Sequence, residues 1–146
     1  MKKILKNTKK LELYYSIDGQ KIEGKNNEMF GDCSGLHGNC AGLRGDCTGL
    51  QGDCTRLYGD CSELHGNCSV LHGECSGLFG DCSGLRGDCT GLRGDCSGLF
   101  GNCSGLFGDC SGLRGVCTGL SGNLDNAEIT DEERKKGIGI NDLVET

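Results

Sequence analysis

The chain has no proline and no tryptophan, and its aromatic side chains are four phenylalanines and three tyrosines among 146 residues. A conventional globular core needs more large apolar side chains, so we expect one small elongated domain without such a core. The lack of proline and of a strict Gly-X-Y period excludes a collagen triple helix. No apolar run is long enough to form a membrane-spanning helix.

What the chain contains in abundance is glycine and cysteine, with 28 and 13 residues. The cysteines recur every seven residues, within a repeat that reads Gly, Asp or Asn, Cys, Ser or Thr, Gly, Leu and one free position. A strict internal repeat predicts a repetitive architecture. We expect the thirteen thiols to form a buried core ladder, made of Cys33, Cys40, Cys47, Cys54, Cys61, Cys68, Cys75, Cys82, Cys89, Cys96, Cys103, Cys110 and Cys117.

A seven-residue period also suits a coiled coil, but the composition excludes helices here. Most repeats carry two glycines, each costing a helix about 1 kcal/mol, or on the order of 20 kcal/mol over the array. The alternative is an all-β fold, a β-solenoid (β-helix) of 13 heptad repeats. If Leu-x-Gly-Asp-Cys forms the strand, Leu, the middle Gly and Cys point inward, while the free residue and Asp point outward.

Ser-Gly would then form the corner, where glycine provides a positive φ, and the middle glycine would leave room inside a narrow coil. A two-residue corner favours a triangular coil of about three repeats (21 residues), although two repeats per coil remain open. Three repeats per coil would place Tyr58, Phe79 and Phe100 in one column.

Both flanks of the array are typical of caps that cover the open ends of a solenoid. Residues 1–30 form a basic segment followed by a predicted β-hairpin from Lys10 to Lys25, with its turn at Asp18-Gly19. Residues 31–122 form the repeat array, and residues 123–146 an acidic cap. The capping box at Thr130 and the stop at Gly137 predict a short helix there. Apolar residues around it would close the last coil, namely Leu124, Ile129, Ile138, Ile140, Leu143 and Val144.

The tandem Gly-Asp-Cys-Ser-Gly-Leu phrase, with the segments 124–134 and 137–144 that follow it, resembles heptapeptide-repeat proteins of phages and anaerobic bacteria. Members of that group often carry valine at the cysteine position, which implies a small buried hydrophobe there. The group has no established activity, so the resemblance implies the fold and a phage or mobile-element origin.

The cysteines admit three interpretations. Zinc sites usually bring Cys-x-x-Cys pairs together locally, whereas these thiols are seven residues apart, so a thiol-rich metal-binding array is an alternative and no metal ligand is assigned. Disulfides would need an oxidising compartment, but no apolar stretch of signal-peptide length follows the basic residues 1–10. We therefore expect a cytoplasmic protein with free, buried and inert thiols.

Two outer positions of the repeat are polar. A hydroxyl follows every cysteine except Cys40, which precedes Ala41, and a ladder of hydroxyls can bind ice or hydrogen-bond to the corner backbone. The residue before cysteine is acidic nine times and otherwise Asn39, Asn67, Asn102 or Val116. Exchange of Asp for Asn indicates hydrogen bonding to the backbone more than a need for charge.

The array from residue 31 to 122 nevertheless carries ten acidic and five basic residues. An acidic rod about as wide as a duplex could mimic nucleic acid and inhibit a host nucleic-acid-binding or defence protein. Direct nucleic-acid binding is disfavoured because the charges are alike.

The free position offers the variation that a specific interface needs. Its aromatic and arginine residues are typical of interface anchors, although stacked aromatics can also simply stabilise a sheet. The candidate interaction surface consists of Tyr58, Phe79, Phe100, Phe107, Arg86, Arg93 and Arg114. His37, His65 and His72 suggest no metal or acid–base pair, since three repeats per coil would separate them.

No nucleophile with a base, no phosphate loop and no pair of carboxylates is recognisable, so we expect no catalytic residues, no cofactor and no enzyme activity. The sequence predicts a β-solenoid scaffold that presents a repetitive surface to an unknown protein partner or to a second copy of itself, without membrane contact.

Overall fold

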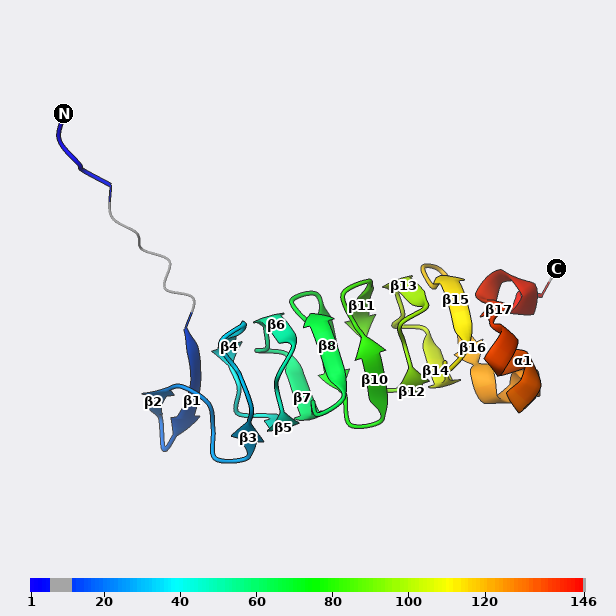
Figure 1. Cartoon of the computed structure of the whole chain (residues 1–146), viewed down its shortest axis with the longest axis horizontal. Coiled ribbons are helices and arrows are strands. Elements are labelled where there is room, and N and C mark those ends of the chain that lie inside the picture. The colour runs from blue at the N-terminus through cyan, green and yellow to red at the C-terminus, as the bar shows by residue number, and fades with distance from the viewer. Residues whose placement is uncertain (6–11, 146) are drawn as a thin grey trace.

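The computed structural model describes residues 1–5 and 12–145 and contains two stacked β-sheets that form a β-solenoid (Figure 1). This confirms the predicted fold class. Sheet A contains, in spatial order, β2 (Gln20–Glu23), β1 (Leu13–Ile17), β4 (Leu36–Asn39), β6 (Leu50–Asp53), β8 (Leu64–Asn67), β10 (Leu78–Asp81), β12 (Leu92–Asp95), β14 (Leu106–Asp109) and β16 (Gly122–Asn123).

Sheet B is built from the alternate repeats. It contains β3 (Met29–Phe30), β5 (Leu43–Asp46), β7 (Leu57–Asp60), β9 (Leu71–Glu74), β11 (Leu85–Asp88), β13 (Leu99–Asn102), β15 (Leu113–Val116) and β17 (Ile138–Gly139). Neighbouring strands are parallel in both sheets except for the antiparallel pair β1 and β2.

Each coil therefore contains two repeats, and the prediction of three repeats per coil is wrong. Successive repeats alternate between the sheets, so β4 pairs with β6 and β5 pairs with β7. The reason is the corner, which is a four-residue turn rather than a two-residue bend. In every repeat the leucine N–H donates to the carbonyl of the cysteine three residues earlier, as Leu78 does to Cys75 at 3.0 Å. Such a β-turn reverses the chain.

The core lies between the two sheets and consists mainly of the leucines and cysteines of the repeat. These side chains point inward as the strand alternation predicts. Met29 takes the leucine position just before the first repeat and is 4% exposed, and Leu124 takes the cysteine position after the last repeat. Every interior coil packs only against its neighbours, as expected for a solenoid.

The two glycines of the repeat have roles opposite to those predicted. The mid-strand glycine takes the positive φ, for example +94° at Gly80, and a Cβ there would lie 2.4 Å from Asp95 Oδ1 and from Ser97 Oγ of the next coil. The corner glycine mostly has an ordinary φ, and its Cβ would instead approach the next coil, as at Gly98, where it would lie 2.4 Å from the Leu113 carbonyl oxygen. Arg56, Glu63 and Val70 replace the corner glycine in three repeats.

The N-terminal hairpin extends sheet A. β1 and β2 are joined at Asp18 and Gly19, whose φ values of 50° and 81° suit a tight hairpin turn. β1 pairs with β4, and the carbonyls of Tyr14 and of Glu12, just before β1, accept hydrogen bonds from the first coil. The hairpin prediction is confirmed from Leu13 onward, whereas its first two residues, 10 and 11, lie outside the described residues.

The C-terminal end is closed by η1 (Leu124–Ala127), α1 (Asp131–Lys136), β17 and η2 (Ile140–Leu143). The predicted capping box is present, with Thr130 Oγ1 accepting from the Glu133 N–H and the Glu133 carboxylate accepting from the Thr130 N–H. Of the apolar residues predicted to close the last coil, Leu124 and Ile140 are buried, but Val144 is 45% exposed because it follows η2 at the surface.

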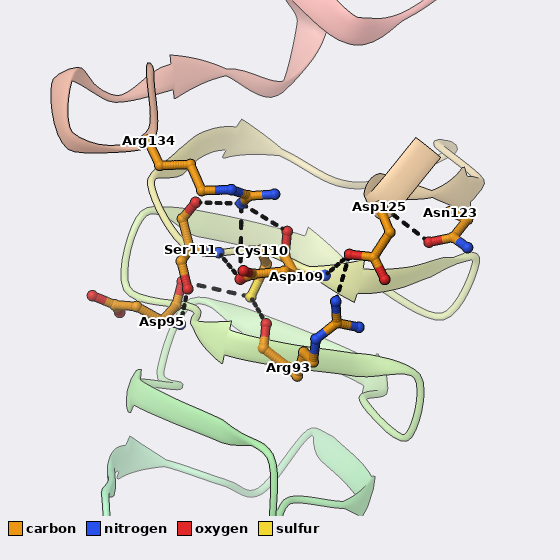
Figure 2. Close-up of polar contacts among 8 residues, drawn as sticks. All are labelled: Arg93, Asp95, Asp109, Cys110, Ser111, Asn123, Asp125 and Arg134. Carbon is orange, nitrogen blue, oxygen red and sulfur yellow. Dashed lines mark hydrogen bonds and ion pairs between the residues drawn. The ribbon is translucent and has the colours of Figure 1, made fainter. Parts of the chain in front are cut away.

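Arg134 fixes α1 to the last coils, as Figure 2 shows. Its Nη1 donates to the carbonyls of Asp109 and Ser111 at 2.9 and 2.7 Å. Its side chain is 15% exposed, and it lies 3.8 Å from the Asp109 carboxylate. The cap is therefore held by polar contacts to the corner of the solenoid as well as by its apolar side chains.

Candidate interaction surface

A hydrogen-bonded ladder on the outside of the solenoid explains the polar positions of the repeat. In one unit of it, the Asp81 N–H donates to Ser97 Oγ in the next coil. The Ser97 hydroxyl and its N–H both donate to Asp95 Oδ1, at 2.6 and 2.9 Å. The mid-strand glycine leaves the space that these two side chains occupy. Glycine, Asp and Ser therefore act together to join one coil to the next.

This geometry explains why Asp and Asn exchange freely, because each contributes one acceptor oxygen. Asn102 Oδ1, for example, accepts from the Ser104 N–H and hydroxyl. It also explains Ala41, since the residue 16 positions earlier is Lys25, which precedes the array and is not part of a strand. The hydroxyls are used within the fold, which favours the backbone-bonding interpretation over ice binding.

The acidic side chains of the ladder are held in their charged form. Hydrogen bonds from Thr48 lower the pKa of Asp46, and hydrogen bonds from Ser62 lower the pKa of Asp60. The pKa of Glu74 is lowered in the same way by Ser76. The acid ladder therefore stays ionised at neutral pH.

Twelve of the thirteen cysteines have no exposed surface, and Cys33 at the open end of the array is partly exposed. All are free thiols. Many donate to carbonyls of the preceding coil, as Cys54 does to the His37 carbonyl at 3.1 Å. Burial raises the pKa of Cys54 and Cys68 to about 12, so these thiols are protonated and unreactive at neutral pH.

Cys47 and Cys61 lie closest together, with 3.2 Å between their sulfurs. Their hydrogen bond raises the pKa of Cys47 and lowers that of Cys61. Among residues 1–5 and 12–145, no three His, Cys, Asp or Glu side chains are grouped so that one metal ion could contact all of them. His37 and His65 lie on sheet A and His72 on sheet B.

The predicted interaction residues are divided between the two faces because each coil contains two repeats. Phe79, Arg93 and Phe107 lie on sheet A, and Tyr58, Arg86, Phe100 and Arg114 lie on sheet B. The predicted column of Tyr58, Phe79 and Phe100 therefore does not exist. Tyr58 and Phe100 share sheet B but are separated by β9 and β11.

The register of the sheets places each free position opposite the Asp or Asn position 16 residues later. Arg44 thus lies opposite Asp60, and Arg93 lies opposite Asp109. Arg93 also pairs with Asp125 at 2.6 Å (Figure 2). Arg86 instead faces Asn102, and Arg114 faces Gly139. Within the described residues, neither Arg86 nor Arg114 forms an ion pair.

Phe100 differs from the other aromatic residues at the free position in what it faces. Tyr58 lies opposite Glu74 and Phe79 opposite Asp95, whereas Phe100 lies opposite Val116. Phe100 and Val116 are 48% and 43% exposed, so they form an apolar pair on the surface. Arg86 and Arg114 lie on β11 and β15, the strands on either side of Phe100. We call Phe100, Val116, Arg86 and Arg114 the Phe100 patch.

Sequence reasoning selected three of these four residues and missed Val116. The available signal was that Val116 is the one apolar residue in a column of Asp, Glu and Asn. The structure shows which hydrogen bond this valine removes. In the other described repeats, the N–H of the residue after cysteine donates to the side chain two residues earlier, as in Thr90 and Ser111. The Thr118 N–H has no such acceptor, although the Thr118 hydroxyl still accepts from the Asn102 N–H. The contact between Val116 and Phe100 replaces the lost hydrogen bond, and a local departure from the rule of a repeat is typical of a functional site.

Within residues 1–5 and 12–145, no helix has the length and apolar character needed to cross a lipid bilayer. Comparison with known proteins found no matching family model, no matching curated protein and no matching solved structure.

Proposed function

We propose that this protein is a non-enzymatic β-solenoid scaffold that binds another protein through the Phe100 patch. The observation that carries the proposal is the replacement of the usual Asp or Asn by Val116 opposite exposed Phe100. An exposed aromatic residue with an apolar neighbour and flanking arginines matches the composition of binding hot spots. The resemblance to phage heptapeptide-repeat proteins supports a phage or mobile-element origin and a partner in the host cytoplasm.

The patch also indicates the chemistry of the partner. Arg86 and Arg114 have no acidic residue opposite them, and the acidic column of sheet B ends at Asp88. The partner surface should therefore offer an apolar pocket for Phe100 with carboxylates at its rim. Desolvated charge pairs of this kind contribute to specificity and association rate.

The test is quantitative affinity capture from host lysate with the wild-type protein and two matched variants. Phe100→Ser removes the proposed anchor, whereas Phe107→Ser removes a phenylalanine of nearly the same exposure, 47% against 48%, from the opposite sheet. We expect Phe100→Ser to lose the specific partner and Phe107→Ser to keep it. Equal retention, or equal loss, in the two variants contradicts the assignment.

Val116→Asn separates binding from folding more finely. The new side chain restores the repeat and can accept from the Thr118 N–H and hydroxyl, which offsets the lost apolar contact. We expect the stability to change by no more than about 1 kcal/mol while the partner is lost. A variant that binds as well as the wild type would show that the apolar pair is not the contact.

A second candidate function is mimicry of nucleic acid. Its specific support is an unbroken column of acids along the first part of sheet B, in which Asp46, Asp60 and Glu74 are half-buried and Asp88 is exposed; exposed Asp32, after β3, holds the same repeat position. The test is a change of Asp46, Asp60 and Asp88 to Asn, which keeps the ladder acceptors, as Asn102 does. Mimicry predicts that capture of a host nucleic-acid-binding protein weakens with salt and is lost in this triple variant. Binding through the Phe100 patch predicts that the triple variant retains its partner.

A further inference from the structure

The outer edge of β2 is the end of sheet A. No other strand of the described residues pairs with it. Proteins protect such an edge with proline, a bulge, an inward-pointing charge, a short strand or exposed charges. β2 has no proline, no bulge and no inward charge, since its inward residue is Ile22, but it is only four residues long and carries Lys21 and Glu23. Because these two charges are opposite in sign, they repel a second strand in some registers and attract it in another.

The hydrogen bonding of the hairpin determines which backbone groups face the free edge. The Gly24 N–H donates to the Leu13 carbonyl, and bonded pairs alternate along an antiparallel ladder. Tyr15 and Ile22 are therefore the next bonded pair. It follows that the N–H and C=O groups of Lys21 and Glu23 point away from β1 and toward the open side.

We propose that two copies of this chain associate through the free edge of β2 around a two-fold axis at Ile22. An antiparallel contact with Ile22 opposite Ile22 of the second copy places Lys21 opposite Glu23 of that copy, twice. The residues that then face each other are those with outward-pointing backbone groups, so four backbone hydrogen bonds can form. Cross-strand pairs of opposite charge favour this register.

The neighbouring registers are disfavoured. A shift that keeps the hydrogen bonding places Lys21 opposite Lys21 or Glu23 opposite Glu23, and like charges directly opposite each other are destabilising. The register with Ile22 opposite Ile22 is therefore favoured both by the charge pairs and by the direction of the free backbone groups. That register is self-complementary, as a two-fold contact requires.

The inner face of the hairpin gives the contact an apolar side. Leu13, Tyr15 and Ile22 are only partly buried, and Ile17 is 49% exposed. A two-fold axis perpendicular to the sheet keeps the inner faces of both hairpins on the same side. The apolar residues of the two copies would then form one continuous strip across four strands, and sheet A would run from one solenoid into the other.

Charge reversal at Lys21 and Glu23 tests the proposal by sedimentation equilibrium of the full chain. We expect the wild type to reach twice the 15.4 kDa chain mass, and Lys21→Glu or Glu23→Lys to raise the dissociation constant at least about tenfold. An equimolar mixture of the two variants should recover the dimer, because the two carboxylates on β2 of the Lys21→Glu copy then face the two lysines on β2 of the Glu23→Lys copy.

Two controls make the result decisive. Lys135→Glu, on the exposed C-terminal helix, makes the same change of net charge as Lys21→Glu but far from β2, and should leave the dimer intact. Lys21 also forms an ion pair with Glu12 at 3.3 Å, so Lys21→Glu could weaken the hairpin itself, and thermal melts report whether the fold is kept. Glu23→Lys leaves the pair of Lys21 and Glu12 in place. A monomeric wild type at every soluble concentration, species larger than a dimer, or a mixture no tighter than the single variants would overturn the proposal.

Discussion

The mid-strand glycine and the corner glycine should respond very differently to alanine. Gly80 has a φ of +94°, which costs an L residue about 1–2 kcal/mol. Its new Cβ would lie 2.4 Å from Asp95 Oδ1 and Ser97 Oγ, which form part of a ladder with three hydrogen bonds. Loss of these exposed bonds adds about 1–2 kcal/mol. We expect Gly80→Ala to destabilise the protein by about 3 kcal/mol.

Gly77, three residues earlier, is the matched control. Its φ is not positive, and its Cβ would make a single close contact, 3.3 Å from the Arg93 Cβ. At 3.3 Å the two neighbouring coils need to separate by only a few tenths of an ångström, and alanine reduces the entropy of the unfolded chain. We expect Gly77→Ala to change stability by less than about 1 kcal/mol.

Urea unfolding followed by circular dichroism measures both variants. The expected difference corresponds to a fall of about 10 °C in the melting temperature of Gly80→Ala. Equal effects at the two positions, or a tolerated alanine at Gly80, would refute the assignment of the positive φ and of the outer ladder to the mid-strand glycine.

The remaining predictions concern the thiols, the ladder, the acids and the cap. A water-soluble alkylating reagent under native conditions should label Cys33 first, and rapid labelling of all thirteen thiols, counted by mass spectrometry, contradicts the burial. Asp95→Ala should cost about 1 kcal/mol in urea unfolding, whereas Asp95→Asn should cost almost nothing, and equal losses would exclude the acceptor role. Folding lowers the pKa of Asp46 and Asp60, so these carboxylates stabilise the folded protein only while they are ionised. The stability should therefore be constant above about pH 5 and should fall as the pH drops through their folded pKa values. Melting curves recorded across that pH range test this. Arg134→Ala should lower the melting temperature by a few degrees and speed hydrogen exchange in α1 alone; uniform exchange would place the effect elsewhere.

Much of the fold follows from the repeat itself. The period-two placement of leucine and cysteine identifies the inward positions, and Asp18-Gly19 and the Thr130 capping box locate the two flanking elements. The number of repeats per coil did not follow, because it depends on whether Ser-Gly bends the chain or reverses it. The hydrogen bond from leucine to the cysteine carbonyl decides this, and composition does not reveal it.

The unknown number of repeats per coil also limited the prediction of the interaction surface. With three repeats per coil, Phe100 would lie beside Phe79, whereas the 14-residue coil places it opposite Val116. Val116 was visible as an exception in its column, but its neighbour could not be identified without the coil length. The roles of the two glycines were exchanged for a related reason, since the side chains that exclude a Cβ belong to the next coil.

Both the fold and the Phe100 patch depend on which residues lie side by side in successive coils. A nuclear Overhauser spectrum of isotope-labelled protein measures this directly. The two-repeat coil predicts cross-peaks between the Phe100 ring and the Val116 methyl groups, and between residues 16 positions apart along the array, such as Asn102 and Thr118. Cross-peaks that instead join Tyr58 to Phe79 and Phe79 to Phe100 would contradict it.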